Sequence, residues 1–200
     1  MKEAIEHLKR ADPVLSEIIG RVGEYRIEFR KPDFETLVKS IIYQQLSGRV
    51  AGVIFGRLAK AAGGRITPAA VLKLRPSRMR TLGLSGQKTA YIRDLARHTR
   101  KGTVAFDKLA GLTDQQVVEH LTQVKGIGPW TVHMFLIFAL RRNDVLPTGD
   151  LGIRNAIRKA YGLDELPLAA EVETMAQRWR PYCTVASWYL WRSLEPNANL

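Results

Sequence analysis

Apolar residues recur at helical spacing along most of this chain. The clearest stripe is Phe34, Leu37, Val38, Ile41 and Ile42, and an i, i+3, i+4, i+7 spacing is typical of an amphipathic helix. The same pattern predicts one or two short helices within 4–22 and further helices near 48–62, 68–74, 76–82, 86–99, 114–124, 131–140, 150–161, 168–179 and 181–194. Residues 25–29 alternate like an extended segment, but one strand cannot build a sheet. The pattern therefore predicts an all-α protein.

Residues 124–150 combine two glycines, a helix start and an isolated acid at short range. Upstream, Thr113 and Gln116 have the spacing of a capping box that begins a helix. Gly126 and Gly128 allow a tight turn and a close approach to another surface, since glycine has no Cβ. Pro129 suits the first position of the next helix. The segment therefore predicts a helix, a short glycine hairpin and a second helix.

The hairpin offers a surface for a phosphate group. Backbone N–H groups of Gly126, Ile127 and Gly128, together with the amino end of the following helix, would form a positively polarised hollow. The Thr131 hydroxyl could join them. A tight turn between two helices, with no ligand, gives the same glycine spacing. The pattern alone leaves both interpretations open.

The chain has a large excess of basic over acidic residues, so we expect a positively charged surface. Lys and Arg outnumber Asp and Glu by 31 to 19 in 200 residues, which gives a net charge of +12 and favours a polyanionic partner. A merely basic, well-solvated surface is the alternative. With 46% hydrophobic and 25% charged residues, the chain has enough apolar surface to exclude disorder.

Composition also excludes several kinds of site. Cys183 is the only cysteine, so an internal disulfide and a cysteine-only metal or iron–sulfur site are excluded. The four histidines show no ligand spacing, and we expect no structural zinc. No apolar run approaches the ~20 residues of a membrane span, and the charged N-terminus is unlike a signal peptide. We expect an intracellular, soluble protein.

The chain resembles the helix-hairpin-helix DNA glycosylase superfamily, in which the hairpin is followed by a loop that carries a catalytic aspartate. Asp150 stands at that place. The pair Gln45-Leu46, the Leu-Gly-Ile-Arg after Asp150 and the tail from Trp179 to Trp191 are similar to the alkylated-base branch, that of 3-methyladenine DNA glycosylase II. The resemblance covers residues 30–195. It implies a hydrolase of base excision repair that acts on double-stranded DNA containing alkylated bases.

The resemblance also implies an architecture of two helical lobes with a cleft between them. Residues 34–142 would form a central lobe that ends in the helix-hairpin-helix, and residues 1–33 plus 143–200 would form the second lobe. The N-terminal β-rich domain of the best-known bacterial members has no room in this chain. A monomer is expected, without cofactor, protein partner or membrane contact, and located in the cytoplasm at the nucleoid or, in a eukaryote, in the nucleus.

By this resemblance Asp150 is the catalytic carboxylate. Breaking a purine–sugar bond develops positive charge on the deoxyribose, which a fixed carboxylate stabilises while it orients or deprotonates water. The alternative is a helix N-cap, since Asp150 stands where a helix begins, and both roles can coexist. Asp144 is interpreted as a solvated partner of Arg141 and Arg142.

Trp130 indicates which reaction is excluded. In the superfamily members that also nick the strand, a lysine nucleophile occupies the position two residues after the second glycine. Here that residue is Trp130. The resemblance therefore implies a glycosylase without lyase activity, which leaves an abasic site.

The base pocket is expected to be aromatic, because an alkylated purine carries positive charge that electron-rich rings attract. Trp130 and Trp191 match pocket tryptophans of the family, whereas Met134 and Leu151 stand where tyrosines are expected and Gly149 where a second acid often sits. The pocket is thus less aromatic than that of the bacterial enzyme. Whether Trp188 and Tyr189 line the pocket or the core stays open.

Three further features are expected to contact DNA. Gln45 and Leu46 would contact the duplex, and Leu46 would be the wedge that fills the gap left by a flipped nucleotide, unless it is an ordinary core leucine. Lys88 would contact the duplex. In the superfamily the hairpin carbonyls also hold a monovalent cation that bridges to DNA, which here implies sodium or potassium at the carbonyls of Val124 and Ile127.

Two other functions stay open. A related glycosylase without lyase activity would act on deaminated or mismatched bases. A non-catalytic helix-hairpin-helix module would only bind distorted duplex DNA. Abasic product distinguishes the enzymes from the module, and a panel of single lesions distinguishes the enzymes from each other.

Overall fold

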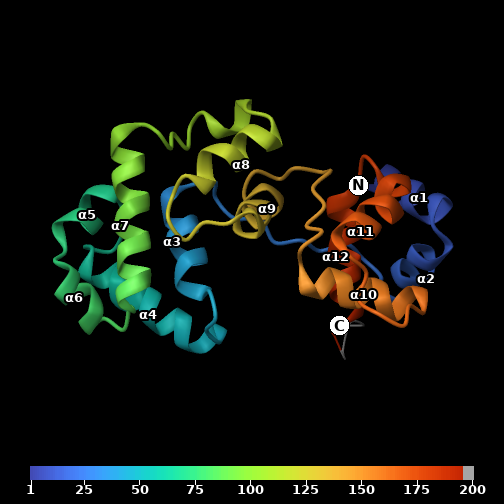
Figure 1. The fold of residues 1–200 in the computed structure, drawn as a ribbon, viewed down its shortest axis with the longest axis horizontal. Coiled ribbons are helices and arrows are strands. Elements are labelled where there is room, and N and C mark those ends of the chain that lie inside the picture. Colours follow the sequence, from blue (N-terminus) through green and yellow to red (C-terminus); the bar gives the residue numbers. More distant parts are fainter. Residues whose placement is uncertain (196–200) are drawn as a thin grey trace. The chain divides into compact units, whose positions relative to one another are not determined.

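A computed structural model describes residues 1–195, and every regular element within them is helical (Figure 1). The elements are α1 (Lys2–Ala11), α2 (Pro13–Val22), α3 (Phe34–Tyr43), α4 (Gly48–Ala61), α5 (Pro68–Lys73), α6 (Pro76–Thr81), α7 (Gly86–Lys101), η1 (Leu109–Gly111), α8 (Asp114–Thr122), α9 (Pro129–Phe138), α10 (Leu151–Tyr161), α11 (Ala169–Ala176), η2 (Gln177–Trp179) and α12 (Cys183–Ser193). The predicted all-α class is confirmed. Residues 196–200, the end of the predicted second lobe, lie outside the described residues.

Helix starts coincide with the capping residues of the sequence. In α8 the Thr113 hydroxyl accepts from the Gln116 N–H at 3.3 Å, and the Gln116 side chain accepts from the Thr113 N–H at 2.9 Å. This is the predicted capping box. At α2 and α3 the N-cap side chains of Asp12 and Asp33 accept from backbone N–H groups of the first turn. Short-range capping therefore sets where these helices begin.

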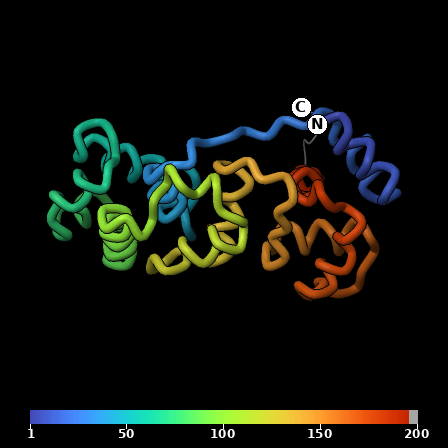
Figure 2. The backbone as a smooth tube through the Cα atoms, turned by 90° about the horizontal axis from the view of Figure 1, so that it is seen from above, coloured from blue at the N-terminus to red at the C-terminus, as the bar shows by residue number. Residues whose placement is uncertain are grey.

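The chain forms two compact units. Unit 1 comprises residues 1–29 and the chain from Leu136 onward, and unit 2 comprises Arg30–Phe135. The lobes implied by the resemblance, 34–142 and 1–33 plus 143–200, stay a prediction. Between α2 and α3, residues 24–33 contain no helix and form the extended blue stretch of Figure 2.

Unit 2 is built around α7, which contacts α3, α5 and α6 (Figure 1). The apolar stripe of α3 is buried, with Leu37 and Ile41 fully enclosed, and α7 also buries Ile92 and Leu95. α3 also contacts α4. This packing fixes the loop between α3 and α4, which carries Leu46.

Unit 1 is built around α12, which contacts α1, α2 and α10. Trp188 packs edge-on against Tyr25, with ring centroids 4.7 Å apart, and against Tyr189 at 5.0 Å. Both Trp188 and Tyr189 are buried in the core of this unit. The open question on these two residues is therefore answered: they form the core.

A buried carboxylate, Asp12, joins the N-terminal helices to the rest of unit 1. Its Oδ1 accepts from the N–H groups of Val14 and Leu15, at 3.0 and 3.2 Å. Its Oδ2 accepts from the Tyr161 hydroxyl at 2.6 Å and from the Trp179 indole at 2.8 Å. Only 1% of Asp12 is exposed, and these four donors offset the cost of burying its charge.

The expectation for Asp144 was wrong. Its carboxylate accepts from the Arg180 guanidinium at 2.9 Å and from the Cys183 N–H at 3.2 Å, not from the neighbouring Arg141 and Arg142. Burial opposes its ionisation, but the hydrogen bonds from Cys183 and Arg180 outweigh it and hold the pKa of Asp144 below its usual value. Tertiary folding brings these partners together from positions far apart in the sequence.

Candidate functional site

Asp150 lies where the loop after α9 meets α10. Its own N–H donates to the Pro147 carbonyl at 2.9 Å, which closes the loop, and its Oδ1 accepts from the Ile153 N–H at 2.9 Å. The N-cap interpretation is therefore confirmed. Only 8% of Asp150 is exposed, whereas its neighbours Gly149 and Leu151 are exposed. The carboxylate is held just beneath the surface, at the positive end of a helix dipole that favours its charge.

Trp191 of α12 is the second partner of this carboxylate. Its indole N–H donates to Asp150 Oδ1 at 2.9 Å. Its ring stacks on Phe138 at the end of α9, with centroids 6.0 Å apart and planes 25° apart. The structure thus brings two sequence-predicted residues, Asp150 and Trp191, into direct contact within unit 1.

Gly152 makes room for this contact. A Cβ at this position would lie 3.0 Å from Asp150 Oδ1 and 3.1 Å from Trp191 Cδ1, tighter than ordinary packing allows. The sequence reasoning missed both Gly152 and Phe138. A glycine in the first turn of an otherwise regular helix was the available signal for Gly152, because glycine is unfavourable there without a packing reason. Phe138 gave no such signal.

The hairpin, in unit 2, is closed by its own backbone and by α7. The Ile127 N–H donates to the Val124 carbonyl at 3.1 Å, so the prediction that this N–H faces a phosphate was wrong. Gly126 has φ +83°, and a Cβ there would lie 2.0 Å from the Tyr91 ring. The Lys125 N–H donates to Asp94 at 3.0 Å. Gly126 is therefore required by both conformation and packing.

Gly128 differs from Gly126. Apart from its two chain neighbours, no heavy atom of residues 1–195 lies within 4 Å of the position that its Cβ would occupy, and its φ is not in the left-handed region. Gly128 and the following Pro129 are exposed. The outer side of the hairpin is thus bare backbone at the start of α9.

The α3–α4 loop (residues 44–47) lies directly against the hairpin. The Gln44 side-chain N–H donates to the Gly126 carbonyl at 3.0 Å. Gln45 is exposed and has φ +57°, an unusual conformation for a residue with a side chain. Leu46 is 37% exposed, so its interpretation as a core leucine is excluded.

Two side chains that were predicted to contact DNA are directed into the protein. The Lys88 ammonium donates to the carbonyls of Ile42 and Gln44, at 2.6 and 2.7 Å. Burial lowers the pKa of Lys88. Thr131 is 4% exposed, so its side chain lies in the interior. Neither side chain faces outward, which weighs against the predicted contacts.

The other predicted pocket residues fall in different units. Trp130 is 50% exposed and Met134 is half-buried, both on α9 in unit 2, whereas Leu151 is exposed beside Asp150 in unit 1. The assignment of these residues to one base pocket stays a prediction.

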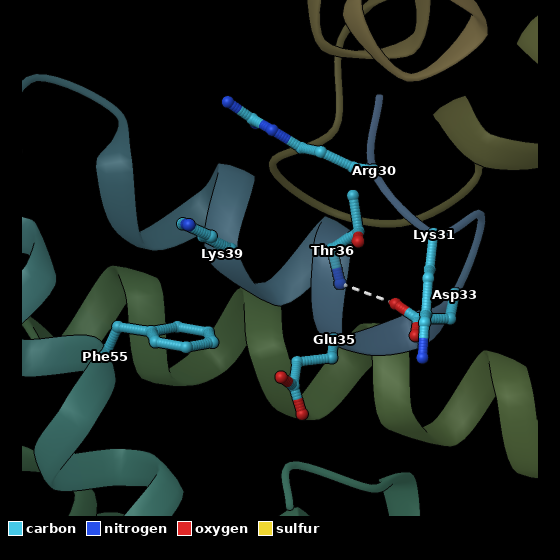
Figure 3. Close-up of a pocket in the computed structure, with 7 residues that line it drawn as sticks. All are labelled: Arg30, Lys31, Asp33, Glu35, Thr36, Lys39 and Phe55. Atoms are coloured by element: carbon cyan, nitrogen blue, oxygen red, sulfur yellow. Dashed lines mark hydrogen bonds between the residues drawn. The ribbon is translucent and has the colours of Figure 1, made fainter. Parts of the chain in front are cut away.

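A basic hollow of about 220 Å³ in unit 2 was not anticipated from the sequence (Figure 3). Its cationic side chains are Arg30, Lys31 and Lys39, with the Lys39 ammonium 5.7 Å from the centre of the Phe55 ring. Its two acids bind backbone instead: Asp33 accepts from the Thr36 N–H, the dashed line in Figure 3, and Glu35 accepts from the Ile66 N–H. The hollow adds to the basic surface of the protein.

Residues 1–195 contain neither a cluster of metal ligands nor a membrane-spanning helix. No three His, Cys, Asp or Glu side chains in this part of the chain gather closely enough to hold a metal ion. None of its helices combines the length and apolar character that a membrane span needs.

Comparison with known proteins gives consistent matches. A family model described as HhH-GPD superfamily base excision DNA repair protein matches residues 38–181. DNA-3-methyladenine glycosylase 1 of Schizosaccharomyces pombe is 34% identical over 194 residues, which span 94% of this chain and 85% of that protein. A putative DNA-3-methyladenine glycosylase of Bacillus subtilis is 38% identical over 117 residues, 58% of this chain and 41% of that protein.

Solved structures share the fold over nearly the whole chain. The 3-methyladenine DNA glycosylase of S. pombe, in complex with abasic DNA, has a TM-score of 0.84 and 34% identity and covers 95% of each chain. The DNA-3-methyladenine glycosidase of Bacillus halodurans has a TM-score of 0.89 and 34% identity, covering 98% of this chain and 91% of that one. This chain therefore belongs to the HhH-GPD superfamily of base excision DNA repair proteins.

Proposed function

We propose that the protein is a DNA glycosylase of base excision repair that hydrolyses the N-glycosidic bond of alkylated purines, of the 3-methyladenine and 7-methylguanine type, and leaves an abasic site. The observation that carries the proposal is the fixed Asp150 carboxylate, bound by the Ile153 N–H and the Trp191 indole. Relatives named as 3-methyladenine glycosylases support the same substrate class.

Asp150 provides the negative charge for the reaction. As the bond between C1′ and the base nitrogen breaks, the base leaves with the electron pair and the sugar becomes oxocarbenium-like. A carboxylate that is already oriented stabilises this positive charge without reorganisation. Water then adds to C1′ and loses a proton, for which Asp150 is the base. An alkylated purine carries positive charge before cleavage, so it leaves without a general acid.

The hydrogen bonds of Asp150 suit this task. Donors from Ile153 and Trp191 converge on one oxygen, Oδ1, which fixes the orientation of the carboxylate plane. Both of these donors are neutral groups, and each stabilises the negative charge by a hydrogen bond. Trp191 is thus assigned two roles, orienting Asp150 and, with Leu151, bounding the base pocket.

DNA binding is assigned to the exposed parts of unit 2. Leu46 and Gln45 enter the duplex where the nucleotide is flipped out, at a cost of a few kcal/mol that bending of the DNA offsets. The bare backbone at Gly128 and the start of α9 receive a phosphate. Binding is expected to weaken steeply with salt, because phosphate contacts release counterions.

A monovalent cation fits the hairpin. Carbonyl oxygens are suitable ligands for sodium or potassium, and the Val124 carbonyl, which accepts one hydrogen bond from Ile127, keeps a second lone pair. The carbonyls of Val124 and Ile127 would hold the cation, which would supply a positive charge toward the DNA backbone.

No strand cleavage is proposed. Trp130 stands where the lysine nucleophile of the bifunctional members is found, so no Schiff base with the sugar forms at this position. An enzyme that acts on chromosomal DNA works inside the cell, and we place this one at the nucleoid or, in a eukaryote, in the nucleus.

The variant Asp150→Asn tests the proposal. Asparagine is also a good N-cap, so α10 should form while the negative charge is lost. Excision of 7-methylguanine from methylated duplex DNA, read as abasic sites after hot alkali, should fall at least about 100-fold, and duplex affinity should stay within about 2-fold. The matched control Asp164→Asn makes the same charge change at an exposed position of unit 1 and should be fully active.

Three outcomes would contradict parts of the proposal. Unchanged excision by Asp150→Asn removes this carboxylate from the mechanism. Excision of deaminated or mismatched bases, but not of alkylated purines, by the unaltered protein replaces the substrate class. Binding without abasic product from any lesion leaves only a DNA-binding module.

A further inference from the structure

The C-terminal end of α3 is capped by a lysine from another helix. The last carbonyls of a helix have no partner within it, and here those of Ile42 and Gln44 both accept from the Lys88 ammonium, at 2.6 and 2.7 Å. The cation also suits the negative end of the α3 dipole. Lys88 therefore holds the point at which the α3–α4 loop leaves α3.

The position of Lys88 is unfavourable for its own helix. Lys88 is the third residue of α7, which starts at Gly86, and a cation in the first turn of a helix opposes the helix dipole. It is also half-buried, with a lowered pKa caused by burial. The two carbonyl bonds offset both costs, so the side chain is directed to α3 by specific contacts.

Gln44 extends this contact to the hairpin. Its backbone carbonyl accepts from Lys88 at 2.7 Å, and its side chain donates to the Gly126 carbonyl at 3.0 Å. Gly126 in turn packs directly against the Tyr91 ring, one turn of α7 beyond Lys88. The loop, the hairpin and α7 thus form one connected set of contacts within unit 2.

Leu46 stands at the exposed end of this set. The preceding residue, Gln45, has φ +57°, a conformation that persists only when its surroundings hold it. Lys88 and Gln44 fix the chain before Gln45, and the Leu46 N–H donates back to the Tyr43 carbonyl at 3.3 Å. The strained residue therefore lies between two anchored residues, with the Leu46 side chain held outward.

We propose that Lys88 is a positioning residue for DNA distortion: by binding the Ile42 and Gln44 carbonyls it fixes the α3–α4 loop against the hairpin, so that Leu46 enters the duplex in register with the phosphate contact. The proposal rests on the wedge role given to Leu46 in the proposed function. It replaces the direct DNA contact expected for Lys88 from the sequence.

The variant Lys88→Met tests this by keeping the length and removing the donors. Single-turnover excision of 7-methylguanine paired with cytosine should slow about 10-fold. Excision of the same lesion opposite an abasic gap should stay within about 2-fold of the unaltered rate, because an unpaired base is cheaper to extract. The control Lys101→Met removes the same charge from the exposed end of α7 and should change neither rate.

A double-mutant cycle with Leu46→Ala shows whether Lys88→Met slows excision through Leu46. If Lys88 acts through Leu46, adding Lys88→Met to Leu46→Ala should slow excision by less than about 2-fold, since residues that act together are not additive. A purely stabilising lysine would slow excision of paired and unpaired lesions alike, additively with Leu46→Ala. Either of those results overturns the proposal.

DNA distortion by the protein can also be measured without base excision, by fluorescence. 2-Aminopurine placed beside a tetrahydrofuran abasic-site analogue should brighten when Leu46 unstacks it, and Lys88→Met should reduce this rise at saturating protein. An unchanged rise overturns the positioning role. Should the unaltered protein excise nothing, the proposed function fails, yet this fluorescence still tests Lys88. Should Lys88→Met not fold, Gln44→Leu removes only the hairpin link and should also reduce the rise.

Discussion

Two aspartates of unit 1, Asp12 and Asp150, are built alike and differ in what surrounds them. Each is buried, each caps a helix, and each accepts from a tryptophan indole, Trp179 at 2.8 Å and Trp191 at 2.9 Å. At Asp12, each of the two carboxylate oxygens accepts from two donors within the core. At Asp150, the backbone and indole bonds converge on Oδ1, beside an exposed glycine.

The same local motif is thus found at a carboxylate buried in the core and at a carboxylate to which we assign a chemical role. An N-capping aspartate with an indole partner is rigid in both places. Donors spread over both oxygens within the core commit the carboxylate of Asp12 to folding. The hydrogen bonds from Ile153 and Trp191 orient the carboxylate of Asp150, and this orientation is the feature on which its proposed reaction depends.

The largest expected effect is on stability, from Asp12→Ala. The change removes an N-cap and leaves the Tyr161 hydroxyl and the Trp179 N–H buried without an acceptor. The free energy of unfolding should fall by about 3–5 kcal/mol, measured by urea denaturation. Well below its melting temperature, the folded variant should excise 7-methylguanine at the normal rate. Loss of excision without loss of stability would remove the contrast between the two aspartates.

A paired substitution of the two tryptophans sharpens the contrast. Trp191→Phe removes the N–H that orients Asp150 and should lower the single-turnover excision rate about 10-fold, the equivalent of one hydrogen bond to a charged group. Trp179→Phe removes the same group at Asp12 and should lower the free energy of unfolding by about 2 kcal/mol with excision unchanged. If Trp191→Phe instead lowered stability and Trp179→Phe lowered the excision rate, the structural and chemical roles of the two aspartates would have to be exchanged.

The smallest effect concerns Asp144, a third carboxylate of the same unit that is partly exposed. Its pKa is lowered in the folded state, so its contribution to stability is present above the unfolded pKa of about 3.9 and is lost as pH falls through the folded value. Asp144→Asn should lower the urea midpoint at pH 7 slightly and flatten its decline below about pH 4. A decline identical to that of the unaltered protein, with Asp164→Asn as control, would show that Asp144 does not contribute.

The sequence predicts most of what is local in this fold. The capping box at Thr113, the N-cap at Asp150 and the start of α2 after Asp12 were predictable because each depends on residues two or three positions away. The partners of Asp144 and Lys88 were not, because they lie 36 to 46 residues distant. Pattern also could not separate core from surface for Trp188, since an aromatic stripe has the same spacing in either place.

The candidate site was predictable only in part, for the same reason. Resemblance pointed to Asp150 and Trp191, which the structure brings together. It did not reveal Gly152 or Phe138, whose roles depend on packing against those residues. Nor did it show that the Ile127 N–H is used within the turn, which leaves the outer face of the hairpin to Gly128.

The difference between the two hairpin glycines makes it possible to measure how closely DNA approaches the protein. Within residues 1–195 nothing beyond the chain neighbours of Gly128 would contact a Cβ there, whereas residue 126 is constrained by the ring of Tyr91. We therefore expect a loss of DNA affinity on substitution at 128 to come from contact with the nucleic acid. Residue 128 can be replaced in turn by alanine, serine and valine, and the DNA affinity of each folded variant measured. The affinity lost at each increase in side-chain size would report how near the sugar-phosphate chain comes.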